Sequence, residues 1–86
     1  MPWSILWTDQ AVRDLSRIDP PIARRIVRKV ESAAANPLRF FSRLVAADEY
    51  KLRVGDYRLL AALDGGSETI LIERVDHRSR IYERRK

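Results

Sequence analysis

Apolar and polar residues alternate most clearly in two adjacent segments near the middle of the chain. Residues 50–54 place apolar side chains between cationic ones, the period-two pattern of a strand with one buried face. Gly55 and Asp56 follow, a pair suited to a tight turn because glycine tolerates positive φ and aspartate can bond its own backbone. Residues 57–63 continue as a second strand. The pattern therefore predicts a β-hairpin, and it brings Lys51, Arg53 and Arg58 close together.

Two helices are predicted before the hairpin, after a first strand over residues 3–7. Thr8 is a candidate N-cap for a helix that runs to about residue 18. Asp19 is a candidate cap for a second helix over residues 21–35, which ends at Asn36-Pro37. The expected inward-facing residues are Ala11, Val12, Leu15 and Ile18 in the first helix and Ile22, Ile26, Val30 and Ala33 in the second.

The segment 38–48 is the least regular, and we expect it to be a loop or partial strand. Its apolar residues Phe40, Phe41, Leu44 and Val45 are expected to be buried. A turn at Gly65-Gly66 then precedes a last strand over residues 69–75. The order β-α-α-β-β-β indicates an α+β fold, with a helical hairpin packed on a mainly antiparallel four-stranded sheet. Residues 1–86 form a single domain, with a basic tail at 83–86.

Composition limits the partners and the compartment. The chain has 86 residues, a formal net charge of +5 and a pI near 10.2, which favours a nucleic acid or an acidic protein as partner. It has no cysteine, no signal-peptide pattern and no apolar run of the roughly 20 residues that span a bilayer. A cytoplasmic protein with no membrane association is expected.

The side chains available for chemistry are cationic and phenolic. One histidine and no cysteine cannot form a standard zinc site, and the glycines lack the spacing of a phosphate-binding loop. No metal and no cofactor are therefore expected. The candidates that remain are Lys51, Arg53, Arg58, His77, Arg78 and Tyr82.

Two segments resemble the signature segments of RelE-type toxins of toxin–antitoxin modules. They are Tyr50-Lys51-Leu52-Arg53-Val54-Gly55-Asp56-Tyr57-Arg58 and Val75-Asp76-His77-Arg78-(x3)-Tyr82, and the likeness to the RelE/ParE superfamily extends over essentially the whole chain. The resemblance implies a RelE-like fold and, for the RelE-like branch, ribosome-dependent cleavage of mRNA in the A site that inhibits translation. It also implies a cognate antitoxin that wraps the toxin with an acidic or amphipathic segment in a hetero-oligomer, besides the ribosome and mRNA as partners.

The resemblance also assigns site residues by position. It implies catalytic roles for Arg58, Arg78 and Tyr82. His77 is added because its reference pKa of about 6.5 suits proton transfer. RNA-binding roles are expected for Lys51, Arg53 and Arg80. The turn is one residue shorter here than in the family pattern, so which of Lys51 and Arg53 takes which role stays open.

Simpler interpretations stand beside these predictions. Arg58 could form an ion pair with Asp56, Glu73 or Asp76; His77 and Tyr82 could be structural. The cations of the second helix are expected to be a solvated face, with contact to ribosomal RNA or to the antitoxin as the alternative. Trp3, Trp7, Phe40 and Phe41 are expected in the core or in an antitoxin groove, and not as platforms on which bases stack. At the level of function, the alternatives are a ParE-like DNA gyrase inhibitor with no nuclease activity and an inactive relative that binds only an antitoxin.

Overall fold

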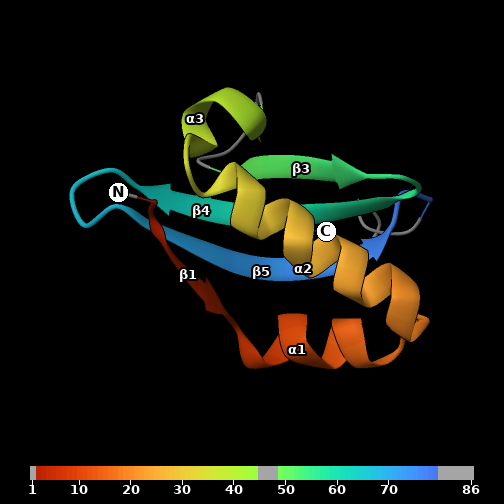
Figure 1. The fold of residues 1–86 in the computed structure, drawn as a ribbon. Helices are drawn as coiled ribbons and strands as arrows, with labels where there is room; N and C mark the ends of the chain where they lie inside the picture. The colour runs from red at the N-terminus through yellow and green to blue at the C-terminus, as the bar shows by residue number, and fades with distance from the viewer. Residues whose placement is uncertain (1, 45–48, 80–86) are drawn as a thin grey trace.

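One sheet forms the centre of the fold, and the helices lie against it or along its edge (Figure 1). The computed structural model describes residues 2–44 and 49–79, and within them the chain forms five strands and three helices. In chain order these elements are β1 (Ser4–Trp7), α1 (Asp9–Ser16), α2 (Pro20–Ala33), α3 (Pro37–Phe40), β2 (Ser42–Arg43), β3 (Tyr50–Val54), β4 (Tyr57–Asp64) and β5 (Thr69–His77).

Strand pairing is antiparallel except at one edge of the sheet. The strand order is β1-β5-β4-β3-β2, and only the β1–β5 pair within these described strands is parallel. The predicted α+β class with a mainly antiparallel sheet is confirmed. The predicted count of four strands is wrong, because the partial strand allowed for segment 38–48 is present: Ser42 and Arg43 form a short strand beside β3. A strand of two residues is too short to show a period-two pattern, so alternation could not reveal it.

Helix α1 begins where the sequence predicts, but it buries a different set of side chains. The Thr8 hydroxyl accepts a hydrogen bond from the backbone N–H of Ala11 at 3.1 Å, as an N-cap does. Val12, which we expected to face inward, is 54% exposed, whereas Asp14 is buried. The helix ends at Ser16, two residues earlier than predicted. Because α1 runs along β5, the side chains that face this strand are the ones that become buried.

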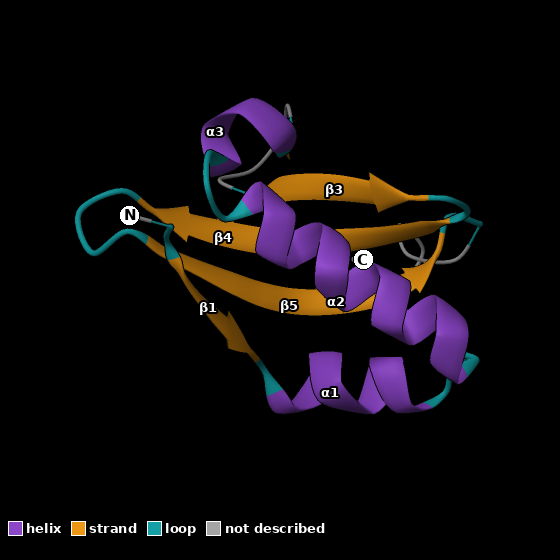
Figure 2. Cartoon of the chain, viewed as in Figure 1, coloured by secondary structure: helices purple, strands orange, loops and turns teal. Residues whose placement is uncertain are grey.

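Helix α2 crosses one face of the sheet and contributes a large part of the core (Figure 2). Of the residues predicted to face inward from α2, Ile26, Val30 and Ala33 are buried and Ile22 is partly buried. Asp19, predicted as the cap, makes no capping side-chain hydrogen bond to any residue that the structure describes, and the helix starts with a proline at its first position. The strand residues in the same core are Leu52, Val54, Leu59, Ala61, Ile70, Ile72 and Val75.

The segment after α2 contains a helical turn, α3, that we did not predict. Phe41 is 4% exposed, so its predicted burial is confirmed. Phe40 is 44% exposed, and its predicted burial is wrong. Phe40 is the last residue of α3, whereas Phe41 leaves the helix in an extended conformation and enters the core. Leu44 is half-buried, and Val45 lies outside the described residues.

Candidate functional site

The β3–β4 hairpin determines which side chains share a face of the sheet. In its antiparallel register Arg53 lies opposite Arg58, and Lys51 lies opposite Leu60. Residues directly opposite each other point to the same side, and the alternate residues of both strands belong to the core beneath α2. Lys51, Arg53 and Arg58 therefore lie together on the side turned away from α2, which we call the second face. The predicted grouping of these three cations is thus found in the hairpin.

A register shift between β4 and β5 precedes the C-terminal part of the site. Ala61 lies opposite Ile72, whereas the preceding residue Leu60 lies opposite Arg74. Glu73 is therefore an extra residue in β5, as in a β-bulge. One extra residue reverses the alternation of side chains in everything that follows it.

This reversal decides which residues of β5 join the second face. Beyond the bulge, Asp76 lies opposite Arg58, and His77 lies opposite Tyr57 on the α2 side. With an unbroken register Val75 would occupy the place of Asp76, and Asp76 would occupy that of His77. The bulge thus brings a carboxylate beside Arg58 and keeps Val75 in the core.

Helix α1 holds the bulge through two polar side chains. The Thr8 hydroxyl donates to the backbone carbonyl of Glu73 at 3.0 Å. The Asp14 carboxylate accepts from Nε of Arg74 at 3.0 Å and from the backbone N–H of Val75 at 2.9 Å. These bonds connect α1 to three consecutive residues of β5, and so support the register on which the site depends.

Asp14 carries its negative charge in a buried position. Burial raises the pKa of this carboxyl, but the hydrogen bonds from Val75, Arg74 and Gln10 outweigh it, and the pKa lies below the ordinary value of 3.8. The sequence analysis gave Asp14 no role. A signal was present, because Asp14 follows Ala11 by three residues and therefore lies on the inward side of the helix.

Arg53 and Arg78 both form hydrogen bonds to the β3–β4 turn. The backbone N–H of Arg78 donates to the carbonyl of Asp56 at 2.8 Å, which extends the β4–β5 ladder beyond His77. Nε of Arg78 lies 3.9 Å from an Asp56 carboxylate oxygen in an exposed ion pair, and Nε of Arg53 donates to the carbonyl of Gly55 at 3.2 Å. The predicted residues Arg53 and Arg78 thus both bond to the turn at the end of the hairpin that carries Arg58.

The structure places His77 apart from this cluster. Its ring packs edge-on against Tyr57, with the centroids 5.6 Å apart and the planes at 81°. The backbone N–H of Ser79 donates to Nδ1 of His77 at 3.2 Å, which assigns Nδ1 the acceptor role. His77 and Arg58 therefore stand on opposite sides of the sheet. Tyr82 and Arg80, the remaining predicted site residues, lie outside the described residues.

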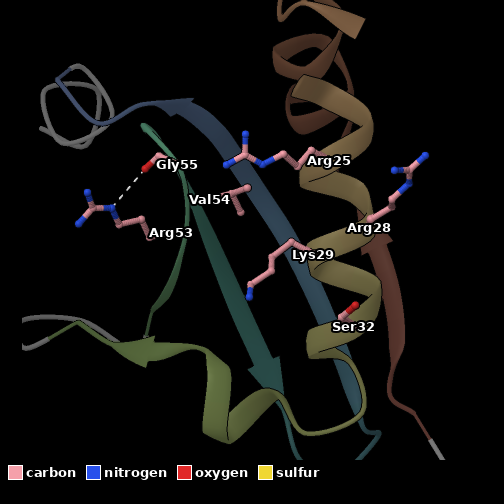
Figure 3. Close-up of a pocket in the computed structure, with 7 residues that line it drawn as sticks. All are labelled: Arg25, Arg28, Lys29, Ser32, Arg53, Val54 and Gly55. Carbon is pink, nitrogen blue, oxygen red and sulfur yellow. Dashed lines mark hydrogen bonds between the residues drawn. The ribbon is translucent and has the colours of Figure 1, made fainter. Parts of the chain in front are cut away.

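The structure has a furrow between α2 and β3 that the sequence analysis did not predict (Figure 3). The sequence analysis assigned the cations of α2 to a solvated face, because their spacing alone does not show what lies opposite them. In the structure Arg25, Arg28 and Lys29 line the α2 side of a hollow of about 400 Å³; Arg25 and Lys29 point toward β3, whereas Arg28 points away from it (Figure 3). The other residues that line it are Ser32, Arg53, Val54 and Gly55.

Two further properties concern only the described residues, 2–44 and 49–79. Among them, no group of three or more His, Cys, Asp or Glu side chains is placed to hold a metal ion. None of their helices has the length and apolar character needed to cross a membrane.

Sequence comparison relates the chain to toxins of toxin–antitoxin systems. Residues 5–82 match the family model described as ParE toxin of type II toxin-antitoxin system, parDE. The curated protein Toxin RelG of Mycobacterium tuberculosis is 37% identical over 87 residues, which cover 98% of this chain and all of that protein.

Solved structures show the same similarity in three dimensions. A chain in the crystal structure of the toxin–antitoxin complex RelBE2 from M. tuberculosis is 34% identical, with a TM-score of 0.83; the match covers 90% of this chain and 99% of that one. A chain in the RelB–RelE antitoxin–toxin complex from Methanococcus jannaschii is 28% identical, with a TM-score of 0.74, over 92% and 96% of the two chains.

Proposed function

Because the chain belongs to the ParE toxin family of type II toxin–antitoxin systems, and is therefore a toxin of such a system, we propose that it is a RelE-like endoribonuclease that cleaves mRNA in the ribosomal A site. One observation carries the proposal: Arg53, Arg58 and Arg78 gather at the turn end of the β3–β4 hairpin. Arginine is always charged and presents a planar fork of donors that matches a phosphate. Such a cluster suits the handling of an RNA phosphate.

The proposed reaction uses the 2′-hydroxyl of the RNA as nucleophile. This hydroxyl loses its proton and attacks the adjacent phosphorus, and the bond to the 5′-oxygen breaks. The products are a 2′,3′-cyclic phosphate and a 5′-hydroxyl, which receives a proton. Arg58 and Arg78 would donate hydrogen bonds to the non-bridging oxygens, where negative charge increases in the transition state. Lys51, Arg53 and Arg80 would hold the RNA on either side of the reacting phosphate.

The groups available for proton transfer support a requirement for the ribosome. Tyr82 would move a proton or stack on a base, but tyrosine has a reference pKa of about 10 and lysine of about 10.4, both far from neutral pH. Groups so poorly matched make a weak free ribonuclease. The ribosome would supply much of the rate by aligning the mRNA with the toxin. In this proposal the protein acts where ribosomes are, in the cytoplasm.

The proposed partner that controls the toxin is a cognate antitoxin. The similar solved structures from M. tuberculosis and M. jannaschii are toxin–antitoxin complexes, so a hetero-oligomer is the expected assembly. The net charge of +5 favours an antitoxin with an acidic or amphipathic segment that folds as it wraps the toxin.

The position of His77 yields a prediction about proton transfer. Since the ring packs against Tyr57 on the side away from Arg58, His77→Ala is expected to lower single-turnover cleavage on ribosomes by less than about tenfold. Thermal unfolding monitors the loss of the ring contact, which is expected to cost about 1 kcal/mol. A loss of cleavage by about 100-fold in a folded His77→Ala protein would instead make His77 a catalytic group.

The experiment that tests the proposed function adds the purified toxin to ribosomes programmed with a defined mRNA. Primer extension then maps new 5′ ends. We expect cuts within the A-site codon, and intact mRNA when ribosomes are omitted. Uncut mRNA in the presence of ribosomes and folded toxin would reject the RelE-like activity.

The description of the matched family favours one alternative, a ParE-like toxin that inhibits DNA gyrase. This alternative predicts that the protein blocks supercoiling of relaxed plasmid by gyrase and leaves mRNA on ribosomes intact. The RelE-like proposal predicts the reverse result in both assays.

A further inference from the structure

We propose that the furrow between α2 and the β3–β4 hairpin binds the backbone of a single-stranded RNA, and that Phe40 at one end of it stacks on a base. This inference rests on the proposed function, because the RNA held there would be the strand cleaved at the arginine cluster. It adds a second binding region, on the α2 side of β3, to the residues of the second face.

Two hollows form one continuous furrow. The larger, of about 400 Å³, runs beside the C-terminal half of α2 as far as Ser32; the smaller, of about 240 Å³, continues to Ile22 and Asp56. Both hollows are lined by Arg25, Val54 and Gly55, so they adjoin. From Ser32 to Ile22 a helix spans about 15 Å, a length that accommodates a few nucleotides of extended strand. The end at Asp56 adjoins Arg78, so the furrow leads to the arginine cluster.

The charges that line the furrow suit a polyanion. Arg25 and Lys29 point from α2 toward the hairpin, whereas Arg28 and Arg53 are exposed at the rims of the furrow and point away from it (Figure 3). Asp56 is the one acidic side chain among the described residues that line either hollow, and it already lies close to Arg78. Phosphate backbones bind to grooves lined in this way because lysine and arginine displace the counterions of the strand.

One of these cations, Arg25, reaches the backbone of the turn at Gly55. Gly55 has φ of +59°, in the left-handed region, and a Cβ added to it would meet Nη2 of Arg25 at 3.3 Å. The guanidinium of Arg25 therefore lies against the backbone of the turn. Close contact with the turn positions this guanidinium between α2 and the hairpin, where the two hollows adjoin.

An exposed aromatic ring beside the furrow favours RNA over an acidic peptide. Phe40 is 44% exposed, and Nζ of Lys29, a furrow residue, lies 5.7 Å from its ring centroid. The guanidinium carbon of Arg39 lies 5.8 Å from the same centroid. A cationic groove combined with an accessible aromatic ring is how proteins hold single strands, because phosphates pair with the cations and a base stacks on the ring. An acidic peptide could pair with the same cations, but its carboxylates would not stack on the ring.

The first test measures the binding of a short 2′-O-methyl RNA, which cannot be cleaved by the 2′-hydroxyl route, by fluorescence anisotropy at several salt concentrations. The double variant Arg25→Glu/Lys29→Glu is expected to bind at least tenfold more weakly than the wild-type protein. The slope of log K against log salt should fall in magnitude by about 1.4, as expected when two phosphate contacts of a single strand are lost. The matched control, Arg17→Glu/Arg24→Glu, removes the same formal charge outside the furrow and should lose less than about threefold.

The second test examines Phe40. Phe40→Ala is expected to weaken RNA binding by about five- to tenfold with little change in the salt slope, because base stacking releases no counterions. Phe40→Trp should preserve the affinity. Leu38→Ala is the control, since Leu38 is another exposed apolar residue of α3, at 63% exposure. Circular dichroism and thermal melts check that every variant is folded.

The outcomes separate this inference from the proposed function. No RNA binding by wild-type protein, or equal losses in the furrow and control variants, would overturn the furrow as an RNA site. If the binding of a polyglutamate peptide depends on the furrow cations and the binding of RNA does not, the furrow is a site for an acidic protein partner instead. Binding that depends on the furrow and on Phe40, without A-site cleavage, would preserve the RNA site and reject the proposed ribonuclease.

Discussion

Replacing Arg78 with alanine is expected to lower mRNA cleavage on ribosomes by about 10²–10³-fold and to leave the domain folded. The large kinetic effect follows from the loss of a charged donor at the phosphate, where charge develops in the transition state. The small structural effect follows from exposure, because the side chains of Arg78 and Asp56 are 55% and 67% exposed. An ion pair so accessible to water contributes at most about 1 kcal/mol. Single-turnover primer extension measures the first effect, and thermal unfolding measures the second.

Three variants serve as controls for Arg78. Arg78→Lys keeps the charge but not the planar fork, and an intermediate rate is expected. Asp56→Ala removes the ion-pair partner and leaves the arginine, so most activity should remain. Arg17→Ala removes an exposed cation of the α1 C-cap and should cleave normally. Normal cleavage by a folded Arg78→Ala protein would exclude Arg78 from the site.

Replacing Asp14 with alanine is expected to lower the free energy of unfolding by about 3 kcal/mol, near the lower end of the range for removing one partner of a buried ion pair. The Asp14 side chain is 3% exposed, and it is bonded to Arg74 and to the backbone of Val75. Its loss leaves both groups without their acceptor. Arg74 is 25% exposed and can still reach water, which limits the cost. Urea unfolding measures the change, and a fall in the melting temperature of more than about 10 °C should accompany it.

The same carboxylate makes stability depend on pH. The pKa of Asp14 is lower in the folded chain than its ordinary value of 3.8, so the folded state favours the ionised form. The stability that Asp14 contributes is therefore complete above about pH 4 and is lost as the pH falls through the folded pKa. The difference in unfolding free energy between wild-type and Asp14→Ala proteins should shrink over this acidic range. Asp64, whose pKa is lowered by hydrogen bonds from Ser67 and Gly66, contributes to both proteins and cancels in the difference.

Two variants distinguish the role of Asp14 from general damage to α1. Gln10→Ala removes one hydrogen bond to the carboxylate, from Nε2 of Gln10 to Oδ1, and should cost about 1 kcal/mol or less. Asp14→Asn keeps an acceptor and removes the charge, so its stability should lie between those of the wild type and Asp14→Ala. If Asp14→Ala is as stable as the wild type, the contact with β5 does not hold α1 in place.

Short-range patterns were sufficient for the main elements. The hairpin of β3 and β4 was predictable because strand alternation and turn chemistry are properties of neighbouring residues. The start of α1 was predictable for the same reason, since an N-cap acts within three residues of Thr8. The cationic face also followed from the hairpin, because pairing across a two-residue turn determines which side chains share a side.

The errors occurred where partners distant in sequence decide the outcome. Val12 was expected to face inward and is exposed, whereas Asp14 is buried because β5 offers it two donors. A helical pattern cannot show what lies beside the helix. Phe40 was expected in the core or in an antitoxin groove because it is apolar; α3 places it outside the core, exposed beside Lys29. The strand β2 exists only through its pairing with β3.

The sequence by itself determined the α+β class, the hairpin and the set of cations available to meet a phosphate, because local alternation, turns and charge are carried by adjacent residues. The tertiary structure decided how these cations are distributed. Asp14 and Arg74 are 60 residues apart, and contacts at that distance hold the bulge that sets the register of Asp76 and His77. The furrow arises in the same way, from the approach of α2 to β3. The register of paired strands and the distance between a helix and a strand depend on how the elements pack, so they cannot be predicted from any one segment.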